Sequence, residues 1–184
     1  MANTTGKKIK DVAIIGGCAS LIYLTIGDIS YRLSLSRGGL NSKLITDMVA
    51  KSAAKKPKNE YKEKLDSMID DGADWFMHQD TEKIIIEKKH RLSLYADLIR
   101  PDKPSNVYII CIHGYTSSPA NMGIYAKKYH ELGYNVLLPS LRGHGDSEQD
   151  FITMGWNDRL DVIEWINYIA ERHPESKIIL HGVS

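Results

Sequence analysis

VYIICIHGYT, residues 107–116, joins six consecutive apolar or aromatic residues to a short polar turn. An uninterrupted apolar run of this length is typical of a β-strand that is buried on both faces of a mainly parallel sheet. A strand with one face in solvent would alternate apolar and polar side chains instead. The run at 107–112 therefore predicts a central strand of an α/β domain, with the polar turn at its carboxyl end.

On both sides of this strand the chain alternates between strand-like and helix-like segments. Upstream, two apolar runs flank a polar connection at Lys88–Arg91, which predicts a hairpin. Downstream, helices and strands alternate, as in a doubly wound, mostly parallel sheet with right-handed crossovers. The expected strands are at 84–86, 92–99, 107–112, 135–139 and 177–180, and the expected helices at 119–132 and 156–173.

Three short polar motifs end three successive predicted strands. They are His113-Gly114-Tyr115, Arg142-Gly143-His144-Gly145-Asp146-Ser147 and Gly182-Val183-Ser184. In this order and spacing they resemble the α/β-hydrolase family, in particular its bacterial esterase and lipase-like members, over about residues 82–184. The resemblance implies an α/β-hydrolase fold of which this chain holds the N-terminal part, truncated after the fifth strand.

The last of these motifs is similar to the first three positions of the family's G-x-S-x-G nucleophile elbow. The resemblance implies that Ser184 is the catalytic nucleophile, on a sharp turn that needs a small neighbour such as Gly182. It also implies that the backbone N–H of Tyr115 is one oxyanion-hole donor, with the second from the residue after Ser184. Each such donor stabilises an acyl-transfer transition state by roughly 3 to 4 kcal/mol.

The other motif residues are expected to support the site without reacting. This supporting set is His113, Gly114, Arg142, Gly143, His144, Gly145 and Gly182. His113 and His144 are also candidate general bases, but the family takes its base from the C-terminal part of the chain. We therefore expect His113 to hold the oxyanion loop and His144 to bond within its own turn.

The expected function of the complete form is hydrolysis of a small-molecule ester or acyl substrate through an acyl-enzyme on Ser184. Residues 1–184 hold neither the acid nor the base of the family's triad, so this polypeptide alone is expected to be inactive. No cofactor is implied, and seven scattered histidines without Cys-x-x-Cys or His-x-x-x-His pairs predict no metal site. The alternative is a noncatalytic, membrane-anchored binding or scaffold protein that retains the hydrolase frame.

An uncharged stretch at residues 12–27 follows three lysines and precedes Arg32 and Arg37. It resembles a signal anchor, although its 16 residues fall short of the roughly 20 that span a bilayer. The positive-inside rule then predicts a single-pass protein of the cell membrane, with its N-terminus inside and its hydrolase domain outside. A cleaved signal peptide of a secreted protein and a buried or surface helix of a cytoplasmic protein are the alternatives.

The chain is expected to have three parts: the anchor at 1–37, a basic connector with a packing helix at 38–81, and the hydrolase part at 82–184. Residues 1–64 hold 12 Lys and Arg against 5 Asp and Glu, while residues 65–184 hold 12 against 18. Because the basic end flanks the apolar run, it favours a membrane partner over nucleic acid. Helical spacing in the connector predicts the face that packs on the domain. That face is Tyr61, Leu65, Met68 and Ile69, followed by Trp75, Phe76 and Met77.

Overall fold

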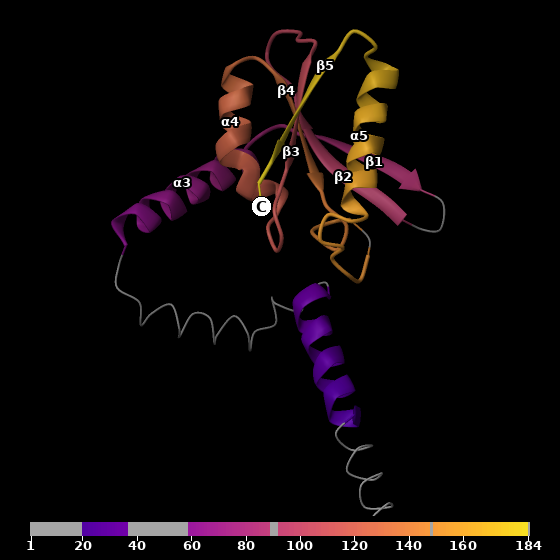
Figure 1. Cartoon of the computed structure of the whole chain (residues 1–184). Coiled ribbons are helices and arrows are strands. Elements are labelled where there is room, and N and C mark those ends of the chain that lie inside the picture. The colour runs from indigo at the N-terminus through magenta and orange to yellow at the C-terminus, as the bar shows by residue number, and fades with distance from the viewer. Residues whose placement is uncertain (1–19, 37–58, 89–91, 148, 184) are drawn as a thin grey trace, which may run out of the picture.

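A computed structural model describes residues 20–36, 59–88, 92–147 and 149–183 of the chain. Its helices and strands follow the order expected for an α/β domain (Figure 1). The elements are α3 (Glu60–Met77), β1 (Glu82–Lys88), β2 (Leu92–Ile99), β3 (Val107–Ile112), the 3-10 turn η1 (Pro119–Met122), α4 (Gly123–Glu131), β4 (Asn135–Ser140), α5 (Asp158–Arg172) and β5 (Lys177–Gly182). Residues 20–35 form a further helix.

The five strands form one mixed sheet in the order β1-β2-β4-β3-β5. β3 is parallel to β4 and to β5, as predicted, whereas β2 is antiparallel to both of its neighbours. A connection as short as the one between β1 and β2 can join only antiparallel strands, so the predicted hairpin accounts for the β1-β2 pair, and β2 is in addition antiparallel to β4. The doubly wound, mostly parallel description thus holds for the β4-β3-β5 half alone.

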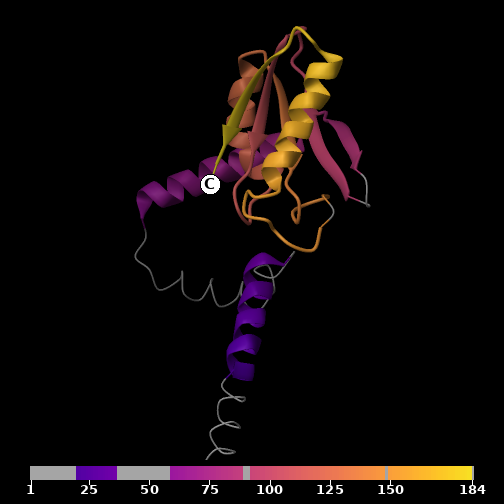
Figure 2. The same cartoon turned by 45° about the vertical axis from the view of Figure 1, so that its right-hand side comes forward.

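Helices cover both faces of the sheet, which gives the domain three layers (Figure 1, Figure 2). On one face, Trp165 of α5 packs on apolar side chains of β1, β2, β3 and β4. On the other face, Phe76 of α3, Met122 of η1 and Ala126 of α4 pack on β2, β3 and β4. The four inner residues of β3, 108–111, are all buried, which confirms the prediction from the apolar run.

Two glycines allow α3 and α4 to cross closely. A Cβ at Gly72 would lie 2.3 Å from the backbone nitrogen of Ile124, and a Cβ at Gly123 would lie 2.0 Å from the carbonyl oxygen of Gly72. Backbones can approach this closely only where no side chain separates them. Because the crossing lies in the second half of α3, the packing predicted for its first half is wrong: Tyr61 is 75% exposed and Met68 is 46% exposed.

The helix at residues 20–35, coloured indigo in Figure 1, contacts the loop between β4 and α5 through its C-terminal end. The carbonyl oxygen of Leu35 accepts a hydrogen bond of 2.7 Å from the N–H of Ile152. The rings of Tyr31 and Phe151 lie 5.4 Å apart, centroid to centroid. This end of the helix is therefore held beside the carboxyl end of the sheet, as both views show (Figure 1, Figure 2).

The signal anchor predicted at residues 12–27 lies partly outside the described residues. Of the helices that the structure describes, none is both long enough and apolar enough to cross a membrane. The helix at 20–35 also carries an ion pair of 2.8 Å between Asp28 and Arg32. The described part of the chain therefore does not support the predicted anchor helix. The helix does present exposed apolar side chains, which are Leu21, Ile22, Leu24, Ile26 and Ile29.

Candidate functional site

The loop that follows β3 is held by His113. One ring nitrogen, Nδ1, bonds the carbonyl oxygen of Gly114 at 3.0 Å, and the other, Nε2, accepts the N–H of Leu141 at 3.1 Å. The side chain is 2% exposed, and burial lowers its pKa to about 4. The ring is therefore neutral near pH 7, with Nδ1 as the donor and Nε2 as the acceptor.

His144 makes the reciprocal connection from the loop after β4. Its Nε2 accepts a hydrogen bond of 3.2 Å from the N–H of Thr116, and its Nδ1 bonds the carbonyl oxygen of Arg142 at 3.1 Å. The rings of His144 and His113 meet edge to face, with centroids 4.9 Å apart. Both histidines thus use their two ring nitrogens on backbone groups, and together they join the two loops. His144 reaches beyond its own turn, which the sequence did not predict.

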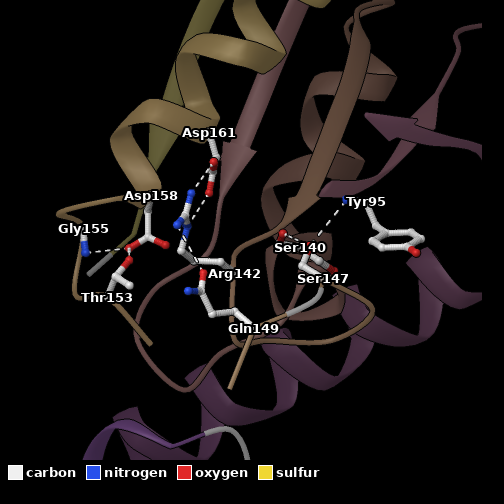
Figure 3. A network of polar contacts seen from close by, with 9 residues as sticks. All are labelled: Tyr95, Ser140, Arg142, Ser147, Gln149, Thr153, Gly155, Asp158 and Asp161. Atoms are coloured by element: carbon white, nitrogen blue, oxygen red, sulfur yellow. Dashed lines mark hydrogen bonds and ion pairs between the residues drawn. The ribbon is translucent and has the colours of Figure 1, made fainter. Parts of the chain in front are cut away.

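Arg142 anchors the loop after β4 to helix α5 (Figure 3). Its Nε and Nη2 atoms donate to the two carboxylate oxygens of Asp161 at 2.7 and 2.6 Å, and Nη1 donates to Gln149 at 3.2 Å. Both members of the ion pair are buried. Such a two-point contact fixes the orientation of the guanidinium plane as well as its position. The arginine therefore supports the loop and does not extend into solvent.

The two glycines of this loop adopt conformations that side chains disfavour. Gly143 has φ of 73° and Gly145 has φ of 50°, both in the left-handed region. A Cβ at Gly143 would also lie 2.9 Å from the carbonyl oxygen of Phe151, and one at Gly145 would lie 2.8 Å from Oγ of Ser140. The glycine-rich motif is thus required by the backbone itself.

Two further polar residues belong to the network in Figure 3: Ser147, the last residue of the motif after β4, and Asp158, which the sequence did not single out. Ser147 donates to the carbonyl oxygen of Ser140 at 2.5 Å. Asp158, the first residue of α5, accepts through Oδ2 from the hydroxyl of Thr153 at 3.0 Å and from the N–H of Gly155 at 2.6 Å. Acidic residues in a first helical turn are expected from the helix dipole alone, so the sequence pattern does not indicate that Asp158 is buried beside a pocket.

A pocket of about 350 Å³ opens at the carboxyl ends of β3, β4 and β5. In α/β sheets, ligands bind at this edge, where loops of neighbouring strands converge. The lining is mostly apolar, with a few polar groups. Lining residues include Tyr115, Leu141, His144, Ile152, Asp158 and Val183. The pocket thus unites all three motifs that the sequence placed at strand ends.

Tyr115 and Val183 bring the predicted oxyanion loop and the predicted elbow to one cavity. The N–H of Val183 donates to the carbonyl oxygen of Ile112 at 3.0 Å, which holds the end of β5 beside the end of β3. No described residue accepts a hydrogen bond from the backbone N–H of Tyr115, while its side-chain hydroxyl donates to the carbonyl oxygen of Ser34. Ser184 itself lies outside the described residues, so its predicted role stays a prediction.

Gly182 is the last residue of β5 and is paired in register with Ile112 of β3. A Cβ there would meet no atom within 4 Å, so nothing in the described part of the chain requires a glycine at this position. Within the same described residues, no cluster of three or more His, Cys, Asp or Glu side chains is placed to hold a metal ion.

Comparison with known proteins gives two informative matches. The chain is 28% identical to the thermostable monoacylglycerol lipase of Bacillus sp. (strain H-257), in a match that covers 38% of this chain and 37% of the lipase. It superposes on the structure of a Pyrococcus furiosus esterase with a TM-score of 0.51 and 28% identity, covering 58% of this chain and 42% of the esterase. No family model matches the chain. The matches therefore span less than half the length of either relative.

Proposed function

We propose that this chain, which carries the N-terminal part of an α/β-hydrolase of the esterase and lipase-like type, cleaves carboxylic esters in its complete form through an acyl-enzyme on Ser184. The observation that carries the proposal is the pocket in which Tyr115 and Val183 meet. Val183 immediately precedes the proposed nucleophile, and Tyr115 carries the proposed oxyanion donor. A nucleophile and an oxyanion donor must face the same small volume to act on one carbonyl group.

In the proposed reaction the Oγ of Ser184 attacks the ester carbonyl carbon and a base takes its proton. Negative charge then develops on the carbonyl oxygen, toward which the backbone N–H of Tyr115 would donate a hydrogen bond. The alcohol leaves, and water later releases the acid from the serine ester. The His113 and His144 contacts support this arrangement because they fix the loop that carries Tyr115.

Neither His113 nor His144 is suited to be the base. Each ring has both nitrogens engaged with backbone groups, and the pKa of His113 lies at about 4 because of burial. A base that works near neutral pH needs a pKa near 7 and a nitrogen free to face the serine. In the family's chain order of Ser, then Asp or Glu, then His, the acid and base would both follow Ser184.

A fluorophosphonate probe tests the nucleophile, because it labels activated serines only. We expect the full-length protein to be labelled and its Ser184→Ala variant to be unlabelled. Ser118→Ala is the matched control, since Ser118 lies in the loop after β3 and its side chain makes no cap hydrogen bond with η1. Labelling that survives Ser184→Ala would refute the proposed nucleophile. An unlabelled wild-type protein would instead favour the noncatalytic scaffold.

The proposed substrate is a small-molecule ester with an apolar acyl group. Apolar side chains form much of the pocket wall and suit a hydrocarbon chain, and they include Ile112, Leu141, Ile152 and Val162. The two relatives also support an ester substrate, since one is named a lipase and the other an esterase. Hydrolysis of aryl esters of increasing acyl length would measure the preference. Equal rates for all lengths would argue against an acyl-binding role for these side chains.

We further propose that the N-terminal segment attaches the protein to the cell membrane, with the hydrolase domain outside. The exposed apolar side chains between Leu21 and Ile29, together with the lysines before residue 12, support this location. The test is membrane fractionation of the full-length protein with and without residues 1–30. This deletion keeps Tyr31 and Leu35, which contact the domain. Equal recovery in the soluble fraction would defeat the proposal.

A further inference from the structure

The loop between β4 and α5 holds two large apolar side chains in solvent beside the pocket. Met154, which lines the pocket, is 63% exposed, and Trp156, which follows the lining residue Gly155, is 72% exposed. Met154 also has φ of 50°, in the left-handed region that residues with a side chain seldom adopt. A strained backbone that keeps an apolar side chain out of the core points to a function for that side chain.

Hydrogen bonds fix the loop in this exposed arrangement. Oδ2 of Asp158 accepts from the hydroxyl of Thr153 and from the N–H of Gly155 (Figure 3). The N–H of Trp156 donates to the carbonyl oxygen of Thr153 at 3.0 Å. The guanidinium of Arg159 lies over the Trp156 ring, 4.1 Å from its centroid. An indole ring beside an exposed arginine is typical of a membrane interface, where the ring meets hydrocarbon and the cation meets phosphate.

The helix at residues 20–35 indicates what covers this end of the domain. The side chains of residues 21–24 are Leu, Ile, Tyr and Leu, and each is at least 59% exposed. Four consecutive residues make more than one full turn of an α-helix, so apolar surface surrounds this part of the helix. A partner protein or a second copy would cover one face of a helix in a groove. Lipid covers a helix on every side, and it is therefore the occupant that fits.

The helix and the loop are joined directly. The carbonyl oxygen of Leu35 accepts the N–H of Ile152, and both views place the loop at the end of the domain that faces the helix (Figure 1, Figure 2). Met154 follows Ile152 by two residues, so their Cα atoms lie no more than about 7 Å apart. Gly27, the last residue of the uncharged stretch, precedes Leu35 by about 12 Å of helix. A lipid layer that covers the uncharged stretch therefore ends close to the loop.

We propose that the loop between β4 and α5 is a second membrane contact, in which Met154 and Trp156 insert into the lipid surface beside the helix. The inference rests on the proposed membrane attachment and adds where the domain itself touches the lipid. Arg159 is exposed and stacked on Trp156, and its guanidinium suits the phosphate of an anionic headgroup. Because Met154 lines the pocket, this contact places the pocket at the lipid surface.

Quenching of tryptophan fluorescence by brominated lipids tests the contact in the full-length protein. The protein is reconstituted with vesicles of phosphatidylglycerol and phosphatidylcholine, the latter brominated near the headgroup end of its acyl chains. Bromine quenches only those tryptophans that enter the bilayer. We expect the wild-type protein to be quenched and the Trp156→Tyr variant to lose this quenching. Trp75→Tyr is the matched control and should keep it, because Trp75 packs on the core beneath α3.

Equal quenching of the wild-type protein and Trp156→Tyr, with both bound to the vesicles, would overturn the lipid contact and leave the tether intact. Emission from Trp156 that is already blue-shifted without vesicles would also overturn it, and would indicate a second copy or another protein segment on the loop. Protein that does not bind the vesicles would reject both contact and tether. Trp156→Phe is a second variant with the same expected loss, and thermal melts should be unchanged because the side chain is exposed.

The measurement does not involve Ser184. Quenching that depends on Trp156, without fluorophosphonate labelling, would therefore keep this inference and reject the proposed reaction. Labelling without such quenching would do the reverse.

Discussion

The interior of the sheet and the loops at its carboxyl end are buried alike, but different forces hold them. Inside the sheet, side chains such as Ile109 and Val136 are fully buried among apolar neighbours. At the loops, His113, Arg142 and its partner Asp161 of α5 are almost as well buried, yet each is fixed by hydrogen bonds or an ion pair. Apolar packing has no direction, whereas polar contacts require particular partners at particular angles. The loops are therefore held by specific partners, whereas the sheet interior is held by burial.

The ion pair of the loops gives the largest expected effect. Asp161→Asn leaves the guanidinium of Arg142 buried without its counter-charge, and we expect it to lower the free energy of unfolding by about 3 to 5 kcal/mol. The control is Glu82→Gln, which breaks the exposed pair with Arg100 and should cost less than about 1 kcal/mol. Urea unfolding measures both. Similar losses of unfolding free energy for the two variants would mean that the buried ion pair contributes no more than the exposed one.

The apolar interior should respond to lost volume. Ile109→Ala in the centre of β3 is expected to cost about 2 to 5 kcal/mol, because it leaves a cavity in a fully packed layer. Its register partner Ile179 in β5 is 47% exposed, so Ile179→Ala should cost less than half as much. Thermal unfolding compares the two. An equal loss would mean that β5 is packed as tightly as β3.

Acid should weaken the loops through His113. Its folded pKa of about 4 lies below the ordinary value of 6.5, so between these two pH values the unfolded chain binds a proton that the folded chain excludes. Stability from this group is complete above pH 6.5 and declines by up to about 3 kcal/mol as the pH falls to 4. Urea titrations across that range measure the slope. His113→Gln is the control and should have a smaller slope, and an unchanged slope would assign the acid response to other groups.

The smallest effect is expected where backbones touch without polar contacts. Gly72→Ala places a methyl group against Ile124 of α4, and we expect the overpacking to cost about 1 to 3 kcal/mol. Gly27→Ala is the control, because a Cβ at Gly27 would meet no atom within 4 Å and alanine favours a helix. Circular dichroism melts compare them. A neutral Gly72→Ala would show that α3 can shift away from α4 at little cost.

The apolar interior could be predicted from the sequence, because strands and helices that are buried show characteristic patterns of apolar residues. The run at 107–112 became β3, an interior strand between β4 and β5, and the amphipathic pattern at 156–173 became α5. The same rule failed for the first half of α3, since periodicity reveals an apolar face but not whether another element covers it. Tyr61 therefore has the right spacing and remains in solvent.

The polar part was less predictable. The motifs located the loops correctly, and the three of them line one pocket. The partners of Arg142 and the burial of Asp158 had no sequence signal, because acids at the start of a helix occur on solvated surfaces too. Contacts between His144 and Thr116 depend on how two loops meet in space, which spacing along the chain does not specify.

The contact between the N-terminal helix and Tyr115 joins two parts of the chain that the sequence analysis assigned separately, the segment at 1–37 and the hydrolase part at 82–184. Tyr115 and Ile152 both line the pocket, and the hydroxyl of Tyr115 and the N–H of Ile152 donate to the backbone oxygens of Ser34 and Leu35. A deletion that extends past residue 33 would remove these two acceptors, so the C-terminal end of the helix is part of the support of the pocket wall.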